Sequence, residues 1–175
     1  MRETDLERLY ERLEKSVYNV VYRWVWNADE AQEIVQDAFV RLWRMRERVE
    51  MRTAEPLVYR IATNLAASRL RSRKVWRWVS LEGLRGSSSP GAGTEQRLIQ
   101  DESHRGLRRA IEALPDELRR IILLTEFSEL TYDQIAEMLS IPSGTVASRR
   151  NRAIRKLRDS LSPENVNERA LGETV

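Results

Sequence analysis

The sequence predicts an all-α protein with two small helical domains joined by a flexible linker, the second of which contains a helix-turn-helix. Apolar residues recur at helical spacing through most of the chain, and no stretch has the alternation of a strand. Between the two helical parts lies GLRGSSSPGAGT at 83–94, a composition typical of flexible linkers. We therefore place the domains at 1–78 and 103–162, the linker at 79–102 and a disordered tail at 163–175.

The composition bounds the class of protein. Of 175 residues, 41% are hydrophobic and 33% charged, so a core can form. The chain has no cysteine and one histidine, His104, for which we expect an exposed helix surface; we therefore expect no cofactor and no metal. The net charge is +3, but the basic residues cluster, which suits a specific nucleic-acid partner. No apolar run could span a membrane, and the N-terminus is unlike a signal peptide, so we expect a cytoplasmic protein.

Capping signals divide the first domain into three helices. Thr4 and Glu7 form a capping box that predicts a helix over 4–26. Asn27 can cap a second helix, which runs to about residue 46. We interpret residues 46–55 as a loop, and the proline at position 56 suits the first turn of a third helix. The predicted inner positions of the second and third helices are Ile34, Val35, Ala38, Phe39, Leu42, Val58, Ile61, Ala62, Leu65 and Ala66.

The outer face of the third helix combines an amide with arginines. Its predicted members are Arg60, Asn64, Ala67, Ser68 and Arg71, and a basic run follows at Arg69, Arg71, Arg73, Lys74 and Arg77. Cations near a helix C-terminus complement the helix dipole, but that effect ends within the last turn. An exposed asparagine can hydrogen-bond a base edge while arginines hold phosphates, so this face is a candidate nucleic-acid contact.

The second domain ends in a helix-turn-helix. Its first predicted stripe is Leu107, Ala110, Ile111 and Leu114; a proline then separates it from a helix whose buried side is Leu118, Ile121, Ile122, Leu124, Thr125 and Phe127. A capping box of Thr131 and Gln134 starts the next helix, Pro142 ends it, and Ser143 can cap the last one. That last helix is predicted to turn Val146, Ala153, Ile154 and Leu157 inward and Thr145, Ser148, Arg149, Arg152 and Arg155 outward. A basic, small and polar outer face suits a major groove.

Several other interpretations remain open. The last two helices could be an ordinary hairpin with a solvated basic face, and the charged face of the second helix could likewise be solvated surface. An enzyme is disfavoured, because no phosphate-binding glycine loop, Ser/His/Asp set or cysteine nucleophile is present. A stand-alone helix-turn-helix transcriptional regulator is the alternative function, and an adaptor or anti-sigma-like regulator that binds only protein is a further one.

Three segments in order resemble the extracytoplasmic-function (ECF) sigma factors of the sigma-70 family. ADEAQEIVQDAFVRLWR resembles their core-polymerase-binding helix, and PLVYRIATNLAASRLRSR their promoter-melting and −10-reading helix. ALPDELRRIILLTEFSELTYDQIAEMLSIPSGTVASRRNRAIRKLR resembles their −35-reading domain. The resemblance covers roughly residues 5–75 and 103–160 and implies a non-enzymatic initiation factor with no small-molecule substrate.

The resemblance also implies roles for individual residues and for partners. Gln36, Asp37, Arg41 and Trp43 would dock on the β′ clamp helices of core RNA polymerase, with the β flap a further contact. Asn64 would hold a flipped −10 base, and the phosphates of the opened strand would be held by Arg60, Arg69, Arg71 and Arg73. The −35 element would be contacted by Ser148, Arg149 and Arg152, and its phosphates by Thr145 and the backbone at Gly144. An anti-sigma factor is expected as a further partner.

Three positions depart from the family pattern. The family often has an aromatic residue where this chain has Ala54 and a tryptophan where it has Leu57. Ala147 stands where many members carry a long basic or polar side chain. The first two departures bear on the loop that captures the flipped base, and the third on one base contact in the −35 element.

Overall fold

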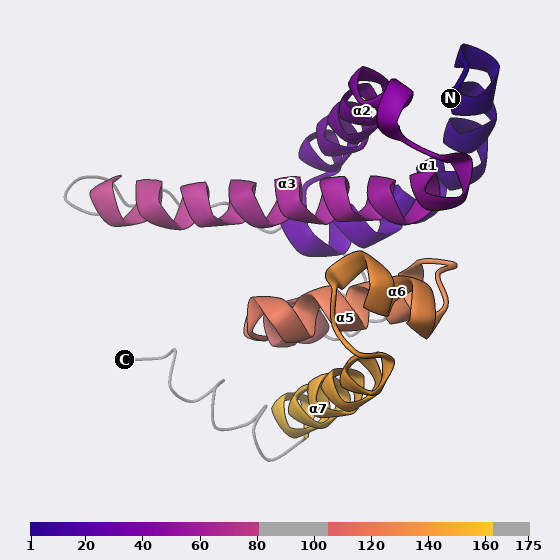
Figure 1. The fold of residues 1–175 in the computed structure, drawn as a ribbon. Coiled ribbons are helices and arrows are strands. Elements are labelled where there is room, and N and C mark those ends of the chain that lie inside the picture. Colours follow the sequence, from indigo (N-terminus) through magenta and orange to yellow (C-terminus); the bar gives the residue numbers. More distant parts are fainter. Residues whose placement is uncertain (81–104, 163–175) are drawn as a thin grey trace, which may run out of the picture.

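A computed structural model describes the backbone of residues 1–80 and 105–162 and the side chains of 1–73 and 105–162. The described residues contain no strand, which confirms the all-α prediction. The first domain consists of α1 (Glu3–Val25), α2 (Ala28–Arg44), the 3-10 turn η1 (Arg46–Arg48) and α3 (Met51–Ser80). The second contains a helix over 105–112, then α5 (Asp116–Phe127), α6 (Tyr132–Leu139) and α7 (Ser143–Leu161) (Figure 1). None of the described helices has both the length and the apolar character needed to cross a membrane.

The helices α1, α2 and α3 pack against one another in pairs and share one core. All the predicted inner positions of α2 and α3 are buried or half-buried, because each helix carries its apolar residues on one face. One prediction is wrong: Ala67, expected on the outer face of α3, is only 2% exposed. A methyl group is small enough for the close approach of helices, so an alanine is compatible with either face.

The ends of α1 and α2 follow different capping rules. The box predicted from Thr4 and Glu7 is wrong, because α1 already begins at Glu3 and the Asp5 carboxylate accepts a hydrogen bond of 2.8 Å from the Arg2 amide. The Asn27 cap is confirmed, since its Oδ1 accepts from the Glu30 amide at 2.8 Å. Asp5 is the third residue of α1, and an aspartate at this position can accept from a free amide at the start of a helix. A threonine is therefore not needed there.

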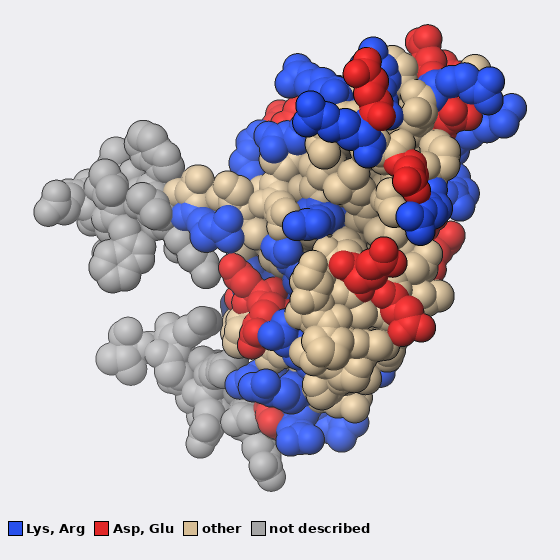
Figure 2. All heavy atoms as spheres, viewed as in Figure 1, with Lys and Arg blue, Asp and Glu red and all other residues tan. Residues whose placement is uncertain are grey.

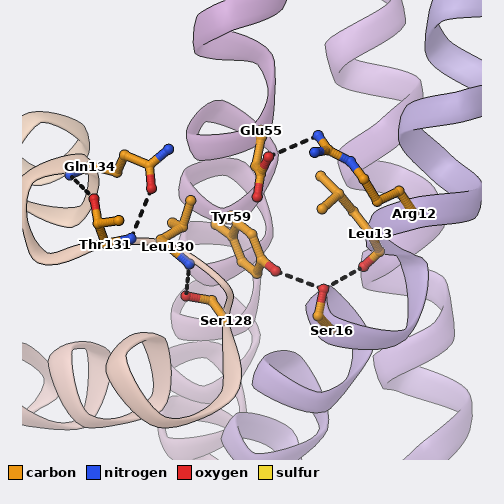
Figure 3. A network of polar contacts seen from close by, with 9 residues as sticks. All are labelled: Arg12, Leu13, Ser16, Glu55, Tyr59, Ser128, Leu130, Thr131 and Gln134. Atoms are coloured by element: carbon orange, nitrogen blue, oxygen red, sulfur yellow. Dashed lines mark hydrogen bonds and ion pairs between the residues drawn. The ribbon is translucent and has the colours of Figure 1, made fainter.

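The segment 46–55, predicted as a loop, is largely helical. After η1, α3 begins at Met51, five residues before the predicted start at Pro56. The fully buried Ala54 anchors this first turn, and so does a 2.8 Å ion pair between Arg12 and Glu55 (Figure 3). Packing therefore overrides the proline, which in the second turn removes a single backbone hydrogen bond.

In the second domain, Arg119 is a buried cation that was not predicted from the sequence. It is 1% exposed, and its guanidinium donates to the carbonyls of Ile111, Glu112 and Leu114. These carbonyls lie at the end of the 105–112 helix, where no amide of that helix can reach them. Arg119 thus joins that helix to α5. The predicted inner residue Leu107 is 40% exposed, so its placement was wrong, whereas Ala110, Ile111 and Leu114 are buried.

The helix-turn-helix is confirmed, with one change at its turn. Thr131 and Gln134 form the predicted box, with hydrogen bonds of 3.3 and 2.8 Å (Figure 3). Ser140 ends α6 at φ 55°, in the left-handed region. The predicted cap, Ser143, is instead the first residue of α7, and Pro142 occupies the cap position without a side-chain bond. A proline can stand there because the first amides of a helix have no partner inside it.

The two domains pack on each other through four helices. Helix α5 lies against α1 and α6 against α3, while α7 packs on α5 and α6 on the side away from the first domain (Figure 1). The Arg23 guanidinium lies 3.9 Å from the ring centre of Phe127. Tyr59 donates to Ser16 at 2.7 Å beside the chain that links α5 to α6 (Figure 3), and its burial raises the pKa of the phenol.

Most of the predicted linker, the predicted tail at 163–175 and His104 lie outside the described residues.

Candidate nucleic-acid interface

The outer surface of α7 is accessible along its length. Val146 and Ala153 are buried against α5 and α6, whereas Gly144, Ser148 and Arg152 are exposed. Thr145, also predicted to contact DNA, is half-buried. A Cβ added to Gly144 would meet no atom within 4 Å, so packing does not require glycine there. This surface is open to a groove-sized partner.

Two consecutive arginines of α7 are held by carboxylates of α5. Arg149 lies 3.0 Å from Glu117, and Arg150 lies 2.7 Å from Glu126. The pairing with Glu126 raises the pKa of Arg150. Arg149, predicted as a DNA contact, is only 28% exposed and lies at the edge of the outer face. Arg152 and Arg155 are exposed and, within the described part of the chain, form no ion pair.

The five predicted −10 residues are all exposed on α3, but on two different sides. Arg60, Asn64 and Arg71 are separated by four and seven positions, which places them on one face of a helix. Arg71 lies 4.0 Å from Asp116 of α5, so this face borders the second domain. Asn64 forms no hydrogen bond within the described residues and leaves its amide free for a partner.

Arg69 and Arg73 lie on the opposite side of α3, against α2. Arg69 is 3.4 Å from Glu33, and Arg73 forms an ion pair with Glu30 and donates to the carbonyl of Val25 at 3.3 Å. The structure therefore brings together three of the five predicted residues and separates the other two. Helical spacing could have shown this, because residues 69 and 73 are about half a turn away from 60, 64 and 71.

The predicted polymerase-docking residues share the outer face of α2. Gln36, Asp37 and Arg41 are exposed, and Trp43 is half-buried beneath the Arg46 guanidinium, which lies 4.3 Å from its ring centre. The sequence analysis missed Val40, which is 46% exposed among these polar residues. Val40 could have been found from the sequence, because it is an apolar side chain outside the inner stripe of the helix.

The departures from the family pattern have structural settings. Ala54 is fully buried, so an aromatic side chain at this position would clash with its surroundings. Leu57 and Ala147 are half-buried. Figure 2 shows basic side chains over the first domain at the top, where acidic ones are interspersed with them, and further basic side chains over α7 at the bottom.

Comparison with known proteins identifies the family of both domains. The family "Sigma-70 region 2" matches residues 9–75, and "Sigma-70, region 4" matches residues 104–157. The ECF RNA polymerase sigma factor SigW of Bacillus subtilis is 32% identical over 83% of this chain and 82% of its own length. The ECF RNA polymerase sigma-E factor of Escherichia coli K12 is 29% identical over 87% of this chain and 84% of its own length.

A solved structure shares the fold. The sigma factor RpoE of Bartonella quintana, crystallised with the anti-sigma factor NepR, is 21% identical with a TM-score of 0.67. The match covers 91% of this chain and 98% of that one. The chain has the two regions of a sigma-70 factor in the expected order. It belongs to the ECF sigma factors of RNA polymerase.

Proposed function

We propose that this ECF sigma factor binds core RNA polymerase through α2, reads the −35 element as duplex with α7, and captures a −10 base with α3. The observation that carries the proposal is the outer face of α7, where Ser148 and Arg152 are exposed. Helix α7 lies on the side of the second domain away from the first (Figure 1). A helix of this kind fits a major groove. The domain limits of 1–78 and 103–162 with a linker at 79–102 are part of the proposal.

The face of α3 that carries Arg60 and Asn64 supports the proposed capture of a −10 base. Asn64 is an exposed amide without a hydrogen bond in the described structure, with Arg60 one turn away. Asparagine is a weak helix former, so a mid-helix asparagine without a structural bond favours a role toward a partner. An unpaired base offers the donors and acceptors that an amide matches. The arginines of α3 would hold the phosphates of the opened strand.

The outer face of α2 supports docking on the polymerase, with the clamp helices of β′ as the expected site and the β flap as a second contact for the C-terminal domain. We further propose an anti-sigma factor as a partner, since the related sigma factor of Bartonella quintana was crystallised with one. A protein with these partners acts in the cytoplasm, binds no cofactor and is not itself an enzyme.

A gel shift with promoter DNA, with and without core polymerase, tests the proposal. We expect a sequence-specific shift only when core enzyme is present. A tight shift by the protein alone, at a stoichiometry of two chains per site, would instead support a stand-alone helix-turn-helix regulator.

The docking surface is tested by a pull-down with core polymerase. Asp37→Arg reverses a charge on the exposed face of α2 and should weaken core binding without changing the melting temperature. Glu11→Arg, at an exposed position of α1, is the matched control and should retain binding. Full core affinity in the Asp37 variant would show that α2 is not the docking helix.

A further inference from the structure

The middle of α7 carries a second amide that the residue roles above leave unused. Asn151 is exposed, lies near the midpoint of the helix and forms no hydrogen bond within the described residues. Asparagine is a weak helix former because its side chain competes with the backbone for hydrogen bonds. At position 151 it neither caps the helix nor bonds to it. The fold thus derives no stabilisation from this amide, which indicates a role toward a partner.

The spacing of α7 places Asn151 within the outer face. Ser148 precedes it by three positions and Arg155 follows it by four, so the three side chains follow one line along the helix. Arg152 lies beside this line and is also exposed. Asn151 therefore lies between a short hydroxyl side chain and two cations on the exposed face of the helix.

The neighbouring arginines are less available than Asn151. Arg149 and Arg150 are directed toward α5 by their pairs with Glu117 and Glu126, at 3.0 and 2.7 Å. Ser148 already donates its hydroxyl to the carbonyl of Thr145 at 3.1 Å. Of the polar side chains from 148 to 151, Asn151 alone has neither a hydrogen bond nor an ion pair among the described residues.

From these observations we propose that Asn151 reads an adenine of the −35 duplex in the major groove. An asparagine amide can donate to N7 and accept from the N6 amino group of adenine at the same time, a pairing that the other three bases do not offer. The inference rests on the proposed function, because it assigns one base contact to the helix proposed to bind the −35 element.

The test uses holoenzyme assembled from the full chain and core polymerase, with a duplex library randomised through the −35 element. Wild-type holoenzyme should select an A·T pair at one position, with roughly 5- to 150-fold preference over the other pairs. Asn151→Ala should lose the preference at that position alone and retain its melting temperature. Lys156→Ala, an exposed cation on the same helix, should weaken all sequences alike and keep the preference.

A change in the base gives a second readout that a structural role would not affect. Replacing the selected adenine with 7-deazaadenine removes the N7 acceptor and should weaken wild-type binding, but should not weaken Asn151→Ala further. Asn151→Asp keeps an acceptor but loses the donor, and it should also lose the adenine preference.

The outcomes distinguish a failure of the proposed function from a failure of the role proposed for Asn151. If wild-type holoenzyme selects no −35 sequence, the proposed function fails, and this inference fails with it. If it selects one and the Asn151→Ala variant selects the same one, only the reading role is wrong. A uniform loss of affinity in Asn151→Ala would identify a phosphate contact and would also overturn the inference.

Discussion

The two helices that we propose as DNA contacts, α3 and α7, differ in how their arginines are held. On α3, Arg69, Arg71 and Arg73 each pair with a carboxylate of another helix, and the Arg71 partner belongs to the other domain. On α7, only the two arginines nearest α5 are paired, while Arg152 and Arg155 extend from the exposed face without a partner in the described chain.

The difference suggests two modes of binding. Helix α7 can meet a rigid duplex without first breaking contacts within the protein. The arginines of α3 must exchange carboxylates for phosphates, which is inexpensive because exposed ion pairs contribute only about 0–1 kcal/mol each. A surface that exchanges partners suits a strand that is itself being rearranged.

The largest expected effect is a loss of stability at Arg119, an arginine to which we assign no contact with a partner. Arg119→Met should lower the free energy of unfolding by about 2–4 kcal/mol, because the carbonyls of Ile111, Glu112 and Leu114 lose their hydrogen bonds to the guanidinium. Urea denaturation measures the loss, with Arg109→Met, an exposed position, as the control. A loss no larger than that of the control would mean that Arg119 is dispensable in joining the 105–112 helix to α5.

The second prediction compares a free arginine of α7 with a held one. Arg152→Ala should cost about 1–3 kcal/mol of holoenzyme binding and relax specificity at one −35 position. Arg149→Ala should weaken all sequences alike and reduce the slope of affinity against salt, as the loss of a phosphate contact does. Gel shifts across several salt concentrations separate the two; equal, uniform losses would show that neither side chain reads bases.

The third prediction concerns Tyr59, which joins α3 to α1 through its hydrogen bond to Ser16. Tyr59→Phe removes the hydrogen bond to Ser16 and should lower the free energy of unfolding by about 1 kcal/mol. Because burial raises the pKa of Tyr59 above 10.0, the folded state holds the phenol proton more tightly than the unfolded state does. The contribution of the Tyr59 phenol to the free energy of unfolding is fully present below about pH 10. It is lost as the pH rises through the raised pKa. Alkaline denaturation should therefore be less steep in the variant.

The smallest effect is expected at the ion pair between the domains. Asp116→Asn removes the partner of Arg71, and both side chains are at least half exposed, so the free energy of unfolding should fall by at most about 1 kcal/mol. Holoenzyme containing this variant should bind promoter already opened around −10 as well as wild type or slightly better. A marked loss on that template would mean that Asp116, and not Arg71, contributes to the site.

Sequence patterns predicted the helices well where one face is continuously apolar, as in α2 and α6. They failed where packing overrides a local signal. Pro56 predicted a helix start, yet buried Ala54 extends α3 before it. The outward side chains of α7 could be predicted from periodicity. The pairing of Arg149 with Glu117 could not, because the two residues belong to different helices whose approach depends on the whole domain.

The central claim is that α3 captures an unpaired base, and Asn64→Ala tests it most directly. Unstacking a base costs a few kcal/mol. A residue that stabilises the opened strand should therefore have its largest effect when the promoter starts as closed duplex. The variant should keep its fold, its core binding and its −35 binding. Permanganate footprinting of its holoenzyme should show fewer unpaired thymines near the start site on duplex promoter, while transcription from a template opened around −10 stays near wild type. Open-complex footprints equal to wild type would contradict the claim and make the segment 46–55 the better candidate.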